Sequence, residues 1–152
     1  MNVNAWLDRA VVVVAVAGAM WLIAAGILKL EEVSAFEASL VEHDIMPERL
    51  IPHIAVALPW IEVAIGALAI YLVAMQLNGV IALRLVAAMF VVFSAYAWIA
   101  HFAGASGKAG CGCGFRSGQL ESWLPLAWEN SGISIAATLV SFAPRMAKGL
   151  AR

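Results

Sequence analysis

Cys111 and Cys113 are the two cysteines of this 152-residue sequence, and glycines flank and separate them over residues 110–114. Two thiols at this spacing can form a disulfide, because the acceptable Cα–Cα distance is about 4.4 to 6.8 Å. The ring is strained, and the central glycine supplies the backbone freedom it needs. Strained, exposed disulfides tend to be labile or catalytic, whereas a stabilising bridge gains most by closing a long loop. The pair predicts redox chemistry, with a minor local bridge as the alternative.

Histidines offer a second kind of chemistry, because imidazole and thiolate together suit zinc or copper. The expected topology places His43, His53 and His101 on the same side of a membrane as the cysteines. None of the three stands at a recognised ligand spacing from a cysteine, so we expect no metal site.

Glu62 lies inside a long apolar stretch, which makes it the third group that could do chemistry. A carboxylate at membrane depth costs about 3 kcal/mol on insertion scales. We expect it to pair with a cation, and the candidates are Lys29 and Arg84, of which Lys29 fits its depth better. A structural ion pair and a proton relay both remain open for this group.

The composition explains why the surroundings of these groups should be lipid. Hydrophobic residues make up 64% of the chain and charged residues 12%, whereas soluble globular proteins carry about 25% charged residues. So little charge cannot cover a soluble surface. The net charge of −1 argues against nucleic-acid binding, which needs a basic stripe.

Four apolar stretches have about the length, some 20 residues, that a helix needs to cross a bilayer. They cover residues 10–28, 54–77, 80–102 and 123–142, and Pro144 is expected to end the last. The second and third are joined by only residues 76–79, and so short a link forces an antiparallel hairpin. The sequence predicts one all-α domain over residues 1–152, an antiparallel four-helix membrane bundle.

Two longer connections would lie at the same end of that bundle. Residues 29–53 are acidic and carry Val33, Phe36 and Leu40 at helical spacing, which predicts a short amphipathic helix on the membrane surface. Residues 103–122 are rich in glycine and serine and contain the cysteines.

Basic residues give the orientation, because they are enriched on the cytoplasmic side. Five lie on the side of the termini: Arg9, Arg84, Arg145, Lys148 and Arg152. Four lie on the other side: Lys29, Arg49, Lys108 and Arg116. We expect cytoplasmic termini, a periplasmic cysteine loop and a bacterial inner-membrane location.

Three segments together resemble a known family. They are residues 26–30 (Gly-Ile-Leu-Lys-Leu), residues 58–62 (Leu-Pro-Trp-Ile-Glu) followed by Gly66, and the Cys-Gly-Cys-Gly loop before the last helix. The combination resembles the MauE branch of the DoxX-like membrane proteins. This resemblance implies a small four-helix protein associated with redox work, with Cys111 and Cys113 as the redox pair and Glu62 and Lys29 as polar elements of the bundle.

The same resemblance implies partners and a cofactor. MauE is linked to maturation of the disulfide-rich methylamine dehydrogenase, relatives often occur alongside thioredoxin-like proteins, and DoxX relatives include a subunit of a quinone-reducing enzyme. The residues themselves show no cofactor, so quinone rests on the resemblance alone.

Two functions from different classes follow. The first is a membrane thiol–disulfide redox protein, or an accessory to one, that exchanges disulfides with a thioredoxin-like or maturing periplasmic partner. The second is a non-catalytic small subunit of a larger respiratory or redox complex, which the lack of a second cysteine pair favours. A transporter is a weaker third alternative, and whether the protein is itself an enzyme stays open.

Overall fold

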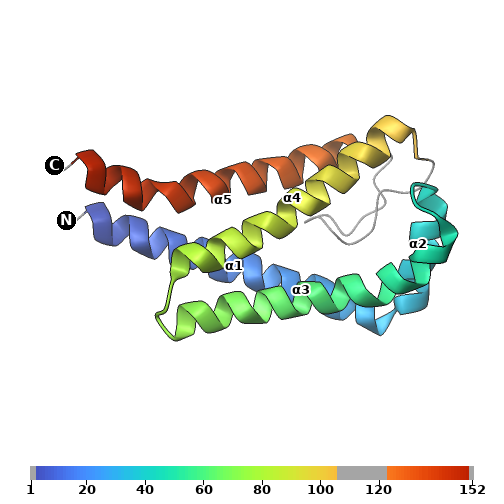
Figure 1. Ribbon diagram of the computed structural model, residues 1–152, viewed down its shortest axis with the longest axis horizontal. Helices are drawn as coiled ribbons and strands as arrows, with labels where there is room; N and C mark the ends of the chain where they lie inside the picture. The colour runs from blue at the N-terminus through green and yellow to red at the C-terminus, as the bar shows by residue number, and fades with distance from the viewer. Residues whose placement is uncertain (1–2, 106–122, 151–152) are drawn as a thin grey trace.

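Helices account for nearly all of the part of the chain that the computed structural model describes, residues 3–105 and 123–150. In order they are α1 (Val3–Glu31), α2 (Val33–His43), a 3-10 turn (Glu48–Leu50), α3 (Ile51–Ala74), α4 (Gly79–Ala103) and α5 (Leu124–Leu150). The long helices α1, α3, α4 and α5 pack lengthwise, α2 lies across one end, and both chain termini lie at the other (Figure 1). We call these the α2 end and the terminal end.

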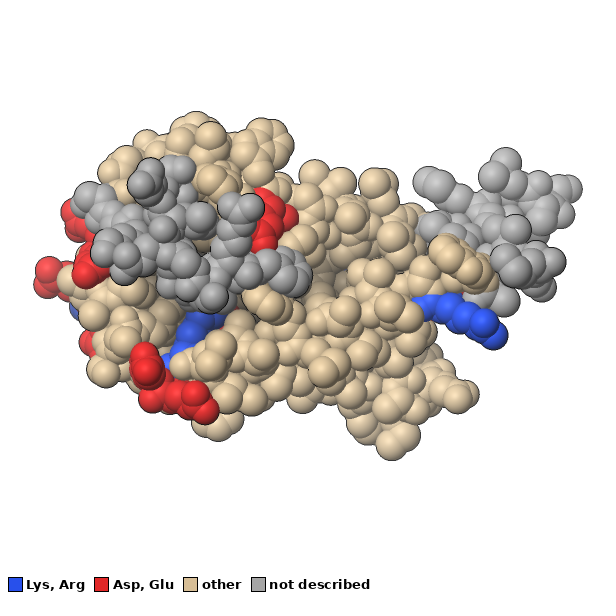
Figure 2. Space-filling view, turned by 180° about the vertical axis from the view of Figure 1, so that it is seen from behind, with Lys and Arg blue, Asp and Glu red and all other residues tan. Residues whose placement is uncertain are grey.

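Three of the helical segments are long and apolar enough to cross a membrane: Asp8–Glu31, Glu48–Ala74 and Gly79–Ala103. Figure 2 shows acidic side chains gathered toward the α2 end and a broad uncharged surface along the middle of the molecule. An uncharged belt of this kind suits the hydrocarbon core of a bilayer. The chain is therefore a multi-pass membrane protein.

The helix bounds differ from those expected because hydropathy marks only the hydrocarbon core. Backbone hydrogen bonding carries α1 to Val3 and Glu31, well beyond residues 10–28. The expectation that Pro144 ends the last helix is wrong, because α5 continues to Leu150. Proline leaves one carbonyl of the preceding turn without its helical donor, and near a membrane surface water can bond such a carbonyl.

The hairpin between α3 and α4 has the expected tight turn. Asn78 precedes α4 in an extended conformation, and its side-chain oxygen accepts a hydrogen bond of 3.1 Å from the amide of Ile81. This is the bond expected of an N-cap residue, and it satisfies one of the free donors of the first turn. At the other end of α4, Gly104 takes a φ of +66°, the left-handed conformation that ends many helices.

Two glycines let α1 and α3 approach closely, and this contact sets the position of the two helices along each other. A Cβ on Gly26 would lie 2.7 Å from the carbonyl oxygen of Pro59. A Cβ on Gly66 would lie 2.6 Å from the carbonyl oxygen of Ala19. Close backbone packing through small residues is the usual basis of helix association in membranes.

Helix α2 is the short helix predicted for the first connection, but its apolar face contacts protein. Phe36 and Leu40 are buried, and they line a cavity of about 200 Å³ with side chains of α3 and α4. The helix therefore covers the α2 end of the molecule, with its apolar face directed toward α3 and α4.

Candidate functional site

Lys29 and Glu62 form a buried ion pair between α1 and α3 near the α2 end. Lys29 Nζ lies 2.5 Å from Glu62 Oε1, and the two residues are 6% and 0% exposed. Glu62 faces α1 because its Cβ packs beside Gly26, where no side chain stands in the way. Of the two cations considered from the sequence, Lys29 is thus the partner, and Arg84 lies elsewhere, on α4.

Aromatic rings surround the ammonium group of this pair. Lys29 Nζ lies 5.5 Å from the ring centroid of Phe36 and 5.6 Å from that of Phe93, close enough for cation–π attraction. The second carboxylate oxygen of Glu62 is buried without a hydrogen-bond partner. An oxygen in this position can accept a proton or a hydrogen bond from water, so the structural ion pair and the proton relay considered from the sequence both stay open.

A second buried cluster joins α2, α4 and the start of α5. His43 is 1% exposed, and its Nδ1 lies 2.7 Å from the hydroxyl oxygen of Tyr96. The ring of Trp123 meets the His43 ring edge-on at 4.5 Å between centroids and lies 5.9 Å from the Tyr96 ring. We call these three residues the His43 cluster.

Burial has a clear electrostatic effect on His43. It lowers the pKa of the imidazole below its ordinary value of 6.5, and the nearby carboxylate of Glu42 raises it by a smaller amount. The other ring nitrogen, Nε2, is buried without a hydrogen-bond partner. The neutral imidazole is therefore the form that suits this packing, because a buried charge without a partner is costly.

The sequence alone does not indicate the His43 cluster, although it contains one signal for it. His43 continues the spacing of Val33, Phe36 and Leu40, so it lies on the apolar face of α2. A histidine on a buried helix face needs a hydrogen-bond partner. Nothing in the sequence indicated that Tyr96, 53 residues later, supplies it.

Polar residues also line the contact between α4 and α5. The hydroxyl groups of Ser94 and Ser131 lie 2.6 Å apart, and the indole N–H of Trp98 donates to Ser131 over 3.1 Å. Asn130 is fully buried, and neither its amide nitrogen nor its oxygen has a hydrogen-bond partner. Asn130 and Ser131, two of the polar residues that weaken the apolar character of α5, thus face protein.

The predicted site residues fall into three groups. Cys111 and Cys113 lie outside the described residues. Lys29 and Glu62 come together. His43, His53 and His101 do not meet, and within residues 3–105 and 123–150 no three His, Cys, Asp or Glu side chains are close enough to hold a metal ion.

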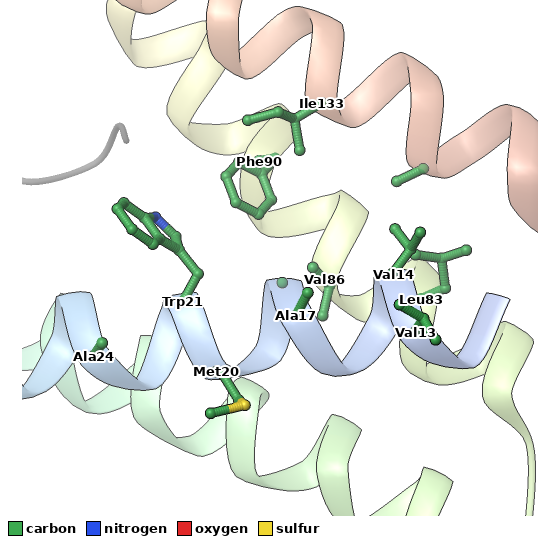
Figure 3. Close-up of a pocket in the computed structure, with 12 residues that line it drawn as sticks. Val13, Val14, Ala17, Met20, Trp21, Ala24, Leu83, Val86, Phe90 and Ile133 are labelled. Atoms are coloured by element: carbon green, nitrogen blue, oxygen red, sulfur yellow. The ribbon is translucent and has the colours of Figure 1, made fainter. Parts of the chain in front are cut away.

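An apolar cavity of about 570 Å³ lies between α1, α4 and α5. Figure 3 shows Trp21, Phe90 and Ile133 toward one end of it and Val13, Val14 and Leu83 toward the other. Its walls offer almost no polar atoms, so this cavity can hold hydrocarbon or an apolar helix but has no groups for catalysis.

Comparison with protein families matches residues 7–143 to the family described as methylamine utilisation protein MauE. The chain belongs to the MauE family. The match runs through all three apolar helices, the cysteine segment and most of α5. No curated protein and no solved structure matches it. MauE membership, with the three apolar helices, makes this a multi-pass membrane protein of a methylamine-utilisation family.

Proposed function

We propose that this MauE-family chain is a membrane thiol–disulfide redox protein, or an accessory to one, that acts through Cys111 and Cys113. Its partner would be a thioredoxin-like or maturing protein outside the cytoplasmic membrane. The proposal includes cytoplasmic termini and α5 as a fourth membrane span, so that the α2 end faces the periplasm.

The observation that carries the proposal is the fixed position of the residues next to the cysteine segment. Ala105, at the end of α4, and Trp123, before α5, are the described residues on either side of residues 106–122. Trp123 is 3% exposed and packs into the His43 cluster. The end of α4 and the start of α5, which flank residues 106–122 in the sequence, therefore both lie at the α2 end (Figure 1).

A fourth span agrees with the way α5 packs. The helix has 27 residues, which at about 1.5 Å per residue gives about 40 Å, more than a hydrocarbon core requires. Two of its polar side chains face other helices, because Asn130 is buried and the hydroxyl group of Ser131 bonds to that of Ser94 on α4. Polar groups in a span are expected to face the protein interior in this way.

The proposed chemistry is a two-electron exchange. The Cys111 thiolate attacks one sulfur of a partner disulfide, which forms a mixed disulfide and releases the other partner sulfur as a thiolate. The Cys113 thiolate then attacks Cys111 sulfur and releases the second partner thiolate. The partner is reduced to a dithiol, and Cys111 and Cys113 are oxidised to a disulfide. The reverse sequence oxidises a partner dithiol.

Trapping tests this step directly. In cells that express the Cys113→Ser variant, the mixed disulfide cannot resolve and should accumulate as a species that reducing agent dissociates. Mass spectrometry should identify a thioredoxin-like or disulfide-rich partner. The Cys111→Ser/Cys113→Ser protein is the matched control. No captured partner in Cys113→Ser cells, with both thiols of the wild-type protein reduced throughout growth, would refute the proposal.

In the reverse direction, in which a partner dithiol is oxidised and Cys111 and Cys113 are reduced, the two electrons need an acceptor, and the resemblance to DoxX-like proteins seen in the sequence favours quinone in the bilayer. Cys111 and Cys113 are the two cysteines of the whole sequence, so the chain has no second thiol pair to relay electrons inward. This favours an accessory that works beside another redox protein.

The alternative is a non-catalytic subunit of a larger membrane complex. The apolar cavity between α1, α4 and α5 favours it, because a neighbouring helix could pack there (Figure 3). Purification of the tagged Cys111→Ser/Cys113→Ser protein from native membranes discriminates the two functions. Unchanged co-purifying subunits and unchanged methylamine-dependent growth would favour the subunit function.

A further inference from the structure

A groove at the terminal end is lined by a cation for which the described residues supply no ion-pair partner. Arg84 lines it together with Ala87, Ala88, Val91 and three residues of α5, and its volume is about 300 Å³. Arg84 is half-buried, and its Nη2 is buried without a hydrogen-bond partner. A buried guanidinium nitrogen without an acceptor is unusual, because guanidinium carries only donors and a lost bond to a charged group is costly.

Among the described residues, none supplies an acceptor to Arg84 Nη2. The buried carboxylate of Glu62 pairs with Lys29 near the α2 end instead. Helix α4 contains no Asp or Glu, and the last acidic residue of the sequence is Glu129, 13 positions before Phe142. The hydroxyl groups of Thr138 and Ser141, which also line the groove, donate to carbonyl groups of α5 itself.

The position of Arg84 fits the boundary between hydrocarbon and lipid headgroups. It is the sixth residue of α4, so its Cα lies about 7.5 Å from the helix start. Side chains on a helix point toward its N-terminus, which takes the guanidinium further toward the terminal end. The ring of Phe142 lies 4.9 Å from the guanidinium carbon and holds it in place.

The rest of the groove is shaped for hydrocarbon. Beyond Arg84, the side chains of Ala87, Ala88 and Val91 follow α4 away from the terminal end, and the two alanines leave room beside the helix. A molecule that fits both the Arg84 guanidinium and the apolar remainder of the groove would have an anionic oxygen at the membrane interface and an apolar chain that runs into the membrane. Basic pockets between membrane helices bind lipid headgroups on the same principle.

We propose that the Arg84 groove binds one acidic phospholipid, with its phosphate on the guanidinium and an acyl chain along Ala87, Ala88 and Val91. Guanidinium can donate two parallel hydrogen bonds to a phosphate. This inference is independent of the cysteine chemistry, and it assigns a specific lipid requirement to the terminal end of the chain.

Lipid titration of the delipidated, full-length protein in detergent tests the proposal. Native mass spectrometry would count bound phosphatidylglycerol and, separately, phosphatidylcholine with the same acyl chains. We expect the wild-type protein to bind the first phosphatidylglycerol about fivefold more tightly than phosphatidylcholine, the effect of one basic residue at a membrane surface. Arg84→Gln should remove this preference. Arg9→Gln, an exposed arginine at the same end, should keep it.

Two further arms keep the test decisive. Ala88→Leu retains Arg84 but fills the groove, so it should weaken phosphatidylglycerol binding even if Arg84→Gln fails to fold. Inorganic phosphate should not displace the lipid, because it has no acyl chain. Preference retained in Arg84→Gln, wild-type binding in Ala88→Leu, or displacement by inorganic phosphate alone would each overturn the proposal.

Discussion

Replacement of Glu62 by glutamine should lower the free energy of unfolding by about 3 kcal/mol, the usual cost of removing one partner of a buried ion pair. Both partners are almost fully buried, at 0% and 6% exposure, so solvent does not screen the charge that is left. Lys29→Met should cost a similar amount, because the Glu62 carboxylate then loses its described hydrogen-bond donor.

The double variant Glu62→Gln/Lys29→Met gives the sharper result. Replacement of a buried pair by neutral groups of similar shape is often close to neutral. We therefore expect the decrease in the free energy of unfolding in the double variant to be smaller, by at least about 2 kcal/mol, than the sum of the decreases in the two single variants. A coupling of this size is within the range for residues in contact. The Phe36 and Phe93 rings can contact the methionine that replaces the lysine.

The measurement is unfolding by SDS titration in mixed micelles, followed by tryptophan fluorescence. Glu31→Gln is the matched control, because Glu31 is an exposed acid two residues from Lys29, and its change should stay within about 0.5 kcal/mol. If the two single effects add to within about 0.5 kcal/mol in the double variant, the pair is not coupled and the structural argument is refuted.

Two further predictions concern helix packing and pH. Gly26→Ala should destabilise the protein by about 1–3 kcal/mol in the same titration, because its Cβ would meet a carbonyl oxygen of α3 at 2.7 Å. Gly132→Ala is the control and should not destabilise the protein, because nothing lies within 4 Å of the added Cβ. Equal effects of the two variants would contradict the close packing at Gly26. Because burial lowers the pKa of His43, the unfolded chain binds a proton that the folded chain does not as pH falls below about 6.5. The free energy of unfolding should therefore be at its full value above that pH and should decline below it. His43→Gln should flatten this decline, whereas His53→Gln, which changes an exposed histidine, should leave it unchanged. An unchanged slope in His43→Gln would exclude His43 as the source of the pH dependence.

Much of the architecture could be predicted because hydropathy reports the solvent around each segment. Predominantly apolar stretches of about 20 residues have few stable options other than membrane helices, since a bilayer leaves no water for unpaired backbone groups. The helix over Val33–His43 was visible in the same way, from apolar residues at helical spacing. The ends of the helices were less predictable, as α5 shows by continuing through Pro144, because beyond the hydrocarbon core water can bond the free groups.

For the candidate site too, the sequence determined some features and the tertiary structure decided others. The sequence by itself determined that Glu62 needs a partner, because a lone carboxylate in hydrocarbon is costly. It also predicts thiol chemistry at Cys111 and Cys113, which stays a prediction. Tertiary structure decided that Lys29 is the partner, since Gly26 and Gly66 set how α1 and α3 align. It also decided that His43 meets Tyr96 and Trp123, and that Nη2 of Arg84 is buried without a hydrogen-bond partner. Periodicity shows which face of a helix avoids lipid or water, but contacts between residues 33 to 80 positions apart depend on which helices pack together and at what level.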